Sequence, residues 1–201
     1  MIKRSDPTRS VPNLVTFGFI GEFRGYYHPS RAPILPKDTF TWFTLSGHTR
    51  NTGGTVTLKS DSPRDTPEIY FNNFEDGNDT AGEDLKALLS GVKMARKMAA
   101  LGADGPAEGE TSPGRDCVTD HDLAEFIKTE AWGHHASCTN KIGPADDPMA
   151  ILDGNFRVHG TVGLRVVDAS VFPRIPGLFI VVPIYMIAEK ASDVILADSN
   201  S

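Results

Sequence analysis

The chain has 201 residues, of which 39% are hydrophobic, and a net charge of −6 at pH 7. This length allows one domain, or two small ones, with a sizeable core. The acidic balance argues against a nucleic-acid partner, which would need a basic surface. No apolar run approaches the roughly 20 residues that span a bilayer, so we expect no membrane span.

The first part of the chain, residues 1–37, mixes Pro, Arg and Ser with short apolar runs. Its composition predicts one strand, at Leu14–Ile20. We interpret residues 1–37 as an N-terminal segment, a remnant of a longer chain, and residues 38–201 as the main domain.

Three stretches after this segment alternate or are rich in Thr, Val, Phe and Tyr, and Gly-Gly and Pro residues separate them. Such punctuated stretches are typical of consecutive antiparallel strands. The predicted strands are Thr39–Ser46, Thr55–Ser60 and Glu68–Phe71.

Two helices follow. Thr80 to Glu83 has the pattern of a capping box, and apolar residues then recur at helical spacing until Gly102. A second helix is predicted from about Thr119, with acids in its first turn, and ends before Gly133. Strands, helices and a final helix together indicate an α+β domain, with helices packed on one face of an antiparallel sheet.

The last third of the chain contains two distinctive runs, residues 163–173 and 183–191. By its β-branched residues, Leu164–Val167 predicts a buried strand that delivers Asp168 and small residues to its carboxyl end. Pro183 suits the first turn of a closing helix. A helix N-terminus favours anionic oxygens, so these runs suit a cofactor with a polar, electron-accepting edge.

These runs resemble the C-terminal part of the glucose-methanol-choline (GMC) family of flavin-dependent alcohol oxidoreductases. Residues 132–143 are similar to the family's catalytic-histidine segment, His-Pro-x-Gly-Thr-x-x-Met-Gly. A match without gaps, taken back from the last glycine, puts the histidine at His135, with His134 as its neighbour. Ala136 stands for the usual proline and Cys138 for the usual glycine.

The resemblance implies roles for several residues. His135 would be the base that takes the hydroxyl proton of an alcohol while hydride leaves for FAD, and His134 is the second candidate. The backbone at Asp168 and Ala169 would approach the ribityl and pyrophosphate side of FAD. The backbone N–H groups of Val181 and Val182 would meet the pyrimidine oxygen of its flavin ring.

One departure concerns Val181. The family commonly has a second catalytic residue there, His or Asn, and valine can neither donate nor accept a proton. A branch of the family that uses one histidine, a partner from elsewhere such as His134, and a loss of activity are all open at this point.

The chain lacks the glycine-rich turn with which the family binds its cofactor. The family holds FAD mainly through an N-terminal unit with a Gly-x-Gly-x-x-Gly turn, and the chain contains no such turn. The resemblance therefore implies a fragment: residues 38–201 as a GMC C-terminal substrate-binding and catalytic domain, whose closing helix would dock on a missing or separate FAD-binding half. Two functions follow: FAD-dependent oxidation of the CH–OH group of an alcohol, or a non-catalytic or truncated chain that does not bind FAD by itself.

The two cysteines, Cys117 and Cys138, are most simply free thiols, with a single bridge between them as the alternative. No metal site is expected. Adjacent histidines such as His134 and His135 point to opposite sides of an extended chain, and the usual ligand spacings are missing.

Overall fold

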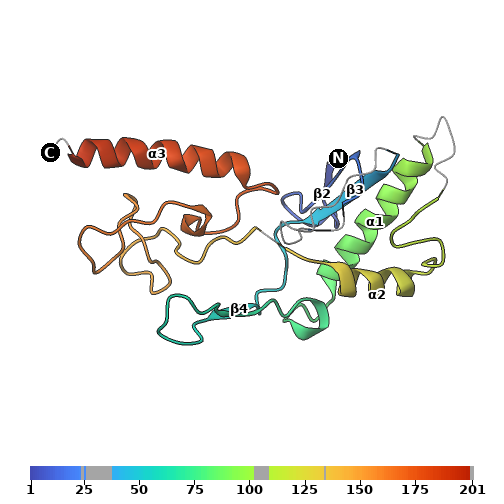
Figure 1. Ribbon diagram of the computed structural model, residues 1–201, viewed down its shortest axis with the longest axis horizontal. Helices are drawn as coiled ribbons and strands as arrows, with labels where there is room; N and C mark the ends of the chain where they lie inside the picture. Colours follow the sequence, from blue (N-terminus) through green and yellow to red (C-terminus); the bar gives the residue numbers. More distant parts are fainter. Residues whose placement is uncertain (24, 26–37, 102–108, 134, 200–201) are drawn as a thin grey trace. The chain divides into compact units, whose positions relative to one another are not determined.

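The computed structural model describes residues 1–23, 25, 38–101, 109–133 and 135–199 (Figure 1). The chain divides into two units, Met1–Ala131 and Trp132–Ser201. The described residues form small antiparallel sheets and α-helices, which confirms the α+β class. The proposed division at residue 38 stays a prediction.

The first unit is built on a three-stranded antiparallel sheet in the order β1-β2-β3. Its strands are β1 (Ile2–Lys3), β2 (Leu14–Ile20) and β3 (Phe40–Ser46). Strands β2 and β3 pair along their whole length, from Leu14 opposite Ser46 to Ile20 opposite Phe40. The strand predicted at residues 14–20 is confirmed, and the one predicted at 39–46 is one residue shorter.

The next two strands, β4 (Thr55–Thr57) and β5 (Glu68–Tyr70), pair with each other in a separate sheet. The prediction of one run of strands therefore needs correction, because β3 pairs with β2 and not with β4. The reason lies in the segment after β3. The carboxylate of the buried Asp84 accepts hydrogen bonds from the amides of Arg50 and Asn51, at 2.8 and 2.9 Å, and so ties this segment to a helix instead of the sheet.

That helix, α1 (Glu83–Leu101), packs on β2 and β3, as Figure 1 shows. Its buried stripe contains small residues, Ala87, Gly91 and Ala95. A side chain at Gly91 would lie 2.2 Å from the Thr44 methyl group, so the glycine permits the close approach of the helix to β3.

The start of α1 differs from the predicted capping box. The side chain of Asp79, not that of Thr80, accepts a hydrogen bond of 2.8 Å from the Asp84 amide. Gly82 precedes the helix with φ of +63°, a conformation that glycine adopts without strain. This turn brings Asp79 to the helix start, which sequence spacing alone did not indicate.

The second helix, α2 (Asp120–Glu130), begins as the sequence predicts. The Thr119 hydroxyl accepts from the Asp122 amide at 3.1 Å, and the Asp122 carboxylate accepts from the Thr119 amide at 2.9 Å. This reciprocal cap satisfies two donors at the helix start. Leu123 and Ile127 are the buried residues of α2, which packs on α1.

The second unit consists of irregular segments, a short 3-10 turn η3 (Ala169–Val171) and the closing helix α3 (Val181–Ser199). Its core is a cluster of Leu152, Phe156, Val171 and Ala191. Figure 1 shows α3 running along the irregular segments of this unit. Within the described ranges, no helix is both long enough and apolar enough to cross a membrane.

The buried strand predicted at Leu164–Val167 is wrong. Arg165 makes only a single bridge with Arg157, and Leu164 is 52% exposed. Val166 alone in this stretch packs against the core cluster. The β-branched residues do indicate extended backbone, but no neighbouring strand extends the pairing beyond this bridge.

Candidate functional site

His135, the predicted base, is half-buried and lies beside an aromatic side chain. The rings of His135 and Phe179 meet edge to face, with 5.6 Å between their centroids and 69° between their planes. Phe179 is 47% exposed and lies two residues before α3. The contact therefore brings the predicted base close to the start of the closing helix. His134 lies outside the described residues.

The segment that carries His135 is hydrogen-bonded to the segment that contains Ala169. Three backbone bonds join them, from the amides of Cys138, Asn140 and Ile142 to the carbonyls of Ala169, Ser170 and Val171, at 3.2, 2.9 and 2.9 Å. Thirty or so residues of sequence separate the two segments, yet they run side by side. The structure thus brings the predicted histidine segment to the predicted Asp168-Ala169 pair.

Asp168 is exposed and caps η3. Its carboxylate accepts hydrogen bonds from the Ser170 amide, at 2.7 Å, and from the Ser170 hydroxyl. The same hydroxyl accepts from the side-chain amide of Asn140 at 3.0 Å. A continuous chain of side-chain hydrogen bonds therefore links Asp168 to the histidine segment.

Val181 and Val182 are the first residues of α3, and their side chains are 56% and 63% exposed. The first hydrogen bond of the helix runs from the Ile184 amide to the Ile180 carbonyl, at 3.0 Å. The N–H groups of Val181 and Val182 precede that bond and so have no acceptor within the helix, and Pro183 has no N–H at all. The helix start therefore presents two donors in an electropositive position.

Two polar contacts hold the end of the histidine segment. Lys141 forms an ion pair with Asp147, at 2.6 Å, and this hydrogen bond lowers the pKa of the Asp147 carboxyl. His159 Nε2 lies 3.2 Å from the carbonyl oxygen of Gly143. His159 is thus engaged in supporting the segment.

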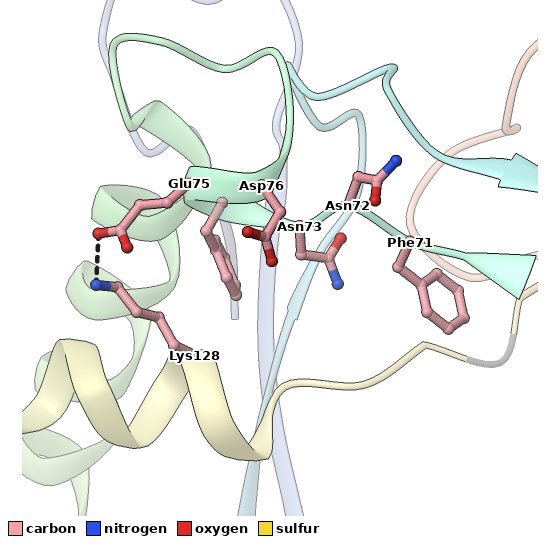
Figure 2. Close-up of a pocket in the computed structure, with 7 residues that line it drawn as sticks. Phe71, Asn72, Asn73, Glu75, Asp76 and Lys128 are labelled. Carbon is pink, nitrogen blue, oxygen red and sulfur yellow. Dashed lines mark hydrogen bonds and ion pairs between the residues drawn. The ribbon is translucent and has the colours of Figure 1, made fainter.

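The first unit contains a hollow of about 280 Å³ that is lined by residues 71–76 and Lys128. The turn η2 (Phe74–Asp76) forms one wall, and Figure 2 shows the Glu75 carboxylate paired with the Lys128 ammonium, 2.5 Å away. Glu75 and then Glu125 raise the pKa of Lys128 by hydrogen bonding, so this amine stays protonated and is no base. The ion pair between Glu75 and Lys128 joins η2 to α2 beside this hollow.

Both cysteines are free thiols. In the parts of the chain that the structure describes, no three His, Cys, Asp or Glu side chains gather as metal ligands do.

The site residue that sequence reasoning missed is Phe179. The sequence shows it at the head of an apolar run, Phe179–Val182, but its contact with His135 joins residues that are more than forty positions apart. Such a contact has no local signal. The sequence offers one hint of an unusual surface here, the apolar run Phe179–Val182, which lies directly before the predicted helix.

A curated relative, an oxygen-dependent choline dehydrogenase of Stenotrophomonas maltophilia (strain R551-3), is 40% identical over 144 residues. The match covers 71% of this chain and 25% of the relative, so the chain spans about a quarter of the length of the curated relatives it matches.

Among solved structures, pyridoxine 4-oxidase from Mesorbium loti superposes with a TM-score of 0.69 at 23% identity, over 96% of this chain and 36% of that chain. At this identity the likeness concerns the fold. A formate oxidase of Aspergillus oryzae RIB40 gives a TM-score of 0.63 at 25% identity, over 79% of this chain and 27% of that one. The family model for GMC oxidoreductase matches residues 50–188, more than half of the chain. The chain therefore belongs to the GMC oxidoreductase family.

Proposed function

We propose that this chain forms the part of a flavin-dependent alcohol oxidoreductase that holds the alcohol and the catalytic base, with residues 38–201 as the substrate-binding and catalytic domain. The observation that carries the proposal is the position of His135: its ring contacts Phe179 at the approach to α3, and its segment is hydrogen-bonded to Ala169. Membership of the family and the relative named choline dehydrogenase support the reaction class.

The residues present fit FAD at one edge of its flavin ring. The N–H groups of Val181 and Val182 have no acceptor within α3, and the helix start favours a carbonyl oxygen that gathers negative charge. The backbone at Asp168 and Ala169 would lie along the ribityl and pyrophosphate side. When bound, FAD supplies the acceptor for the hydride that leaves the alcohol carbon.

His135 would take the proton from the alcohol hydroxyl. An imidazole has an unperturbed pKa of about 6.5, so it can accept a proton near neutral pH without being protonated beforehand. His134 is the second candidate. The side chain of Val181 cannot transfer protons, so on this proposal one histidine does the acid–base work.

The outward face of α3 supports a separate FAD-binding half as partner. One side of this helix packs on the core through Ala191 and Ile187. The opposite side carries Val181, Val182, Tyr185 and Met186, all exposed. A helix that is apolar on both sides is normally buried, so this face suits a protein partner.

The alternative function is a non-catalytic chain that keeps the fold but does not bind FAD by itself. Val181, where the family commonly has a catalytic His or Asn, favours this reading for the chain taken alone. Both readings agree on the fold and differ in turnover.

The test is a chimera in which residues 50–188 replace the matching region of the Stenotrophomonas maltophilia relative. We expect the chimera to oxidise an alcohol, and His135→Ala to lower its turnover by about 100-fold or more while flavin stays bound. Turnover and the visible flavin spectrum are measured on the same samples.

His121→Ala is the matched control, because His121 is an exposed histidine in the first turn of α2. It should leave turnover unchanged. His134→Ala decides between the two adjacent histidines. Equal turnover of His135→Ala and the parent chimera would remove the proposed mechanism, and a chimera that binds flavin without any turnover would favour the non-catalytic reading.

A further inference from the structure

We propose that Asn140 is a positioning residue, whose side chain fixes the histidine segment at one place along residues 168–170. Because that segment carries the proposed base, this inference rests on the proposed function. Asn140 is attached to Ser170 twice, by its main-chain amide to the carbonyl at 2.9 Å and by its side-chain Nδ2 to the hydroxyl at 3.0 Å. It lies five positions after His135 and acts through the chain between them.

The main-chain bonds alone do not select one register. The amides of Cys138, Asn140 and Ile142 donate to the consecutive carbonyls of residues 169–171. Every non-proline residue offers the same main-chain donor and acceptor, so a segment that slips by one residue finds equivalent groups. A side-chain pair exists in one register only. The bond between Asn140 and Ser170 therefore specifies where the histidine segment lies.

This bond requires a donor at position 140. The Ser170 hydroxyl donates its single proton to the Asp168 carboxylate, so any further partner of this oxygen has to donate to it. The side-chain amide of Asn140 supplies that N–H. A carboxylate in its place would have the same shape but only acceptor oxygens. Asn140→Asp therefore removes the hydrogen bond and keeps the volume of the side chain.

The backbone between the base and Asn140 needs this support. Cys138 is in the left-handed region, with φ of 71°, and a strained residue persists only where surrounding contacts hold it. Its own amide bond to Ala169 is the longest of the three, at 3.2 Å, whereas Asn140, two residues later, is held twice. Release of Asn140 would let Cys138 relax and so redirect the chain that carries His135.

The first test measures hydrogen exchange on the 201-residue chain and needs no flavin. We expect Asn140→Asp to lower the protection factors of the Cys138 and Ile142 amides about fivefold or more, because hydrogen-bonded neighbours open together. Protection factors correct for the intrinsic exchange rates that the substitution changes. The amides of α2, which belongs to the other unit, should keep the protection of the parent.

The second test uses the chimera, which includes both residues. Asn140→Asp and the uncharged Asn140→Ala should each lower kcat about tenfold, with KM within about twofold of the parent and an unchanged flavin spectrum. A base displaced by about 1 Å can cost up to about 100-fold in rate while the binding contacts remain. Ser170→Ala should resemble Asn140→Ala. Ser170→Thr keeps the hydroxyl and should retain most of the kcat that Ser170→Ala loses.

Asn155→Ala is the matched control. Asn155 is an exposed asparagine of the same unit, and its side chain makes no hydrogen bond with the residues that the structure describes. Surface substitutions of this kind have small effects, so kcat and the protection of the Cys138 and Ile142 amides should stay within about twofold of the parent.

Unchanged protection of the Cys138 and Ile142 amides in Asn140→Asp would overturn the inference. So would a parental kcat in both Asn140 variants of a chimera in which His135→Ala abolishes turnover. Failure of the proposed function would look different: His135→Ala would leave turnover intact, whereas hydrogen exchange would still distinguish Asn140→Asp from the parent.

Discussion

The backbone at Cys138 is in the left-handed region, with φ of 71°. A residue with a Cβ atom is strained there, whereas glycine is not. The family segment that this stretch resembles has glycine at this place. Compared with that family pattern, Cys138 places a residue with a Cβ atom where glycine would be free of strain. The position lies three residues after the proposed base.

Cys138→Gly should raise the free energy of unfolding by about 0.5 to 1 kcal/mol, because relief of the backbone strain exceeds the extra entropy of the unfolded chain. Equilibrium urea unfolding measures the change.

Cys117→Gly is the control. Cys117 is not among the described non-glycine residues with positive φ, so glycine there brings only its entropic cost of about 0.5 to 1 kcal/mol. A loss of stability of equal size in both variants would contradict the strain at Cys138.

At the scale of elements, Asp198 near the end of α3 holds two arginines. Its carboxylate accepts hydrogen bonds from Arg157 and Arg165, which face each other across a single antiparallel bridge. The hydrogen bond from Arg157, and then the positive charges of both arginines, lower the pKa of Asp198. Without the carboxylate, two like charges would lie opposite each other, which destabilises such a pair.

Asp198→Asn should therefore lower the melting temperature at pH 7. A carboxyl with a lowered folded-state pKa contributes stability above its unfolded pKa of about 3.9, and this contribution disappears as the pH falls through the lower, folded value. The difference between variant and parent should thus shrink steadily below about pH 4. Melting temperatures between neutral and acid pH measure it.

Asp193→Asn, on the same helix, controls for the loss of any one negative charge. A pH-independent difference, or the same difference for Asp193→Asn, would show that Asp198 does not act through the two arginines. High salt should weaken the effect of Asp198→Asn, because the groups are partly exposed to solvent.

Elements with local signals could be predicted from the sequence. The helix that starts near Thr119 with acids in its first turn and the strand at residues 14–20 depend on neighbours in the chain, and both are as predicted. The strand prediction for Leu164–Val167 was wrong because a strand also needs a partner strand. The residues of the segment itself do not indicate whether such a partner exists. The start of α1 failed for a similar reason, since Gly82 redirects the chain and so selects Asp79.

The candidate site was likewise predictable only in part: its residues could be selected from the sequence, whereas the contacts between them could not. The family resemblance selected His135, Asp168, Ala169, Val181 and Val182, and their roles stay predictions. The structure adds their proximity, through the backbone bonds of residues 138–142 and the ring of Phe179. Those contacts join distant parts of the chain, and periodicity cannot report them.

At the scale of the whole molecule, we expect the chain by itself to bind FAD weakly or not at all. The chain's own candidates for FAD are main-chain groups at Asp168, Ala169, Val181 and Val182, and no Gly-x-Gly-x-x-Gly turn accompanies them. When it is purified with added FAD, the 201-residue chain should retain little or none, whereas the chimera should be yellow. The visible spectrum and the ratio of flavin to protein measure this, and a stoichiometric yellow chain would reveal an unrecognised FAD site.

The three hydrogen bonds between residues 138–142 and 169–171 have a consequence for motion. Local opening of a protein occurs in cooperative units, and hydrogen-bonded neighbours open together. The segment that carries His135 cannot separate from residues 169–171 without breaking all three bonds. Any ligand that orders Asp168 and Ala169 therefore also orders the histidine segment, so part of the entropic cost of positioning the proposed base would be met before the substrate binds.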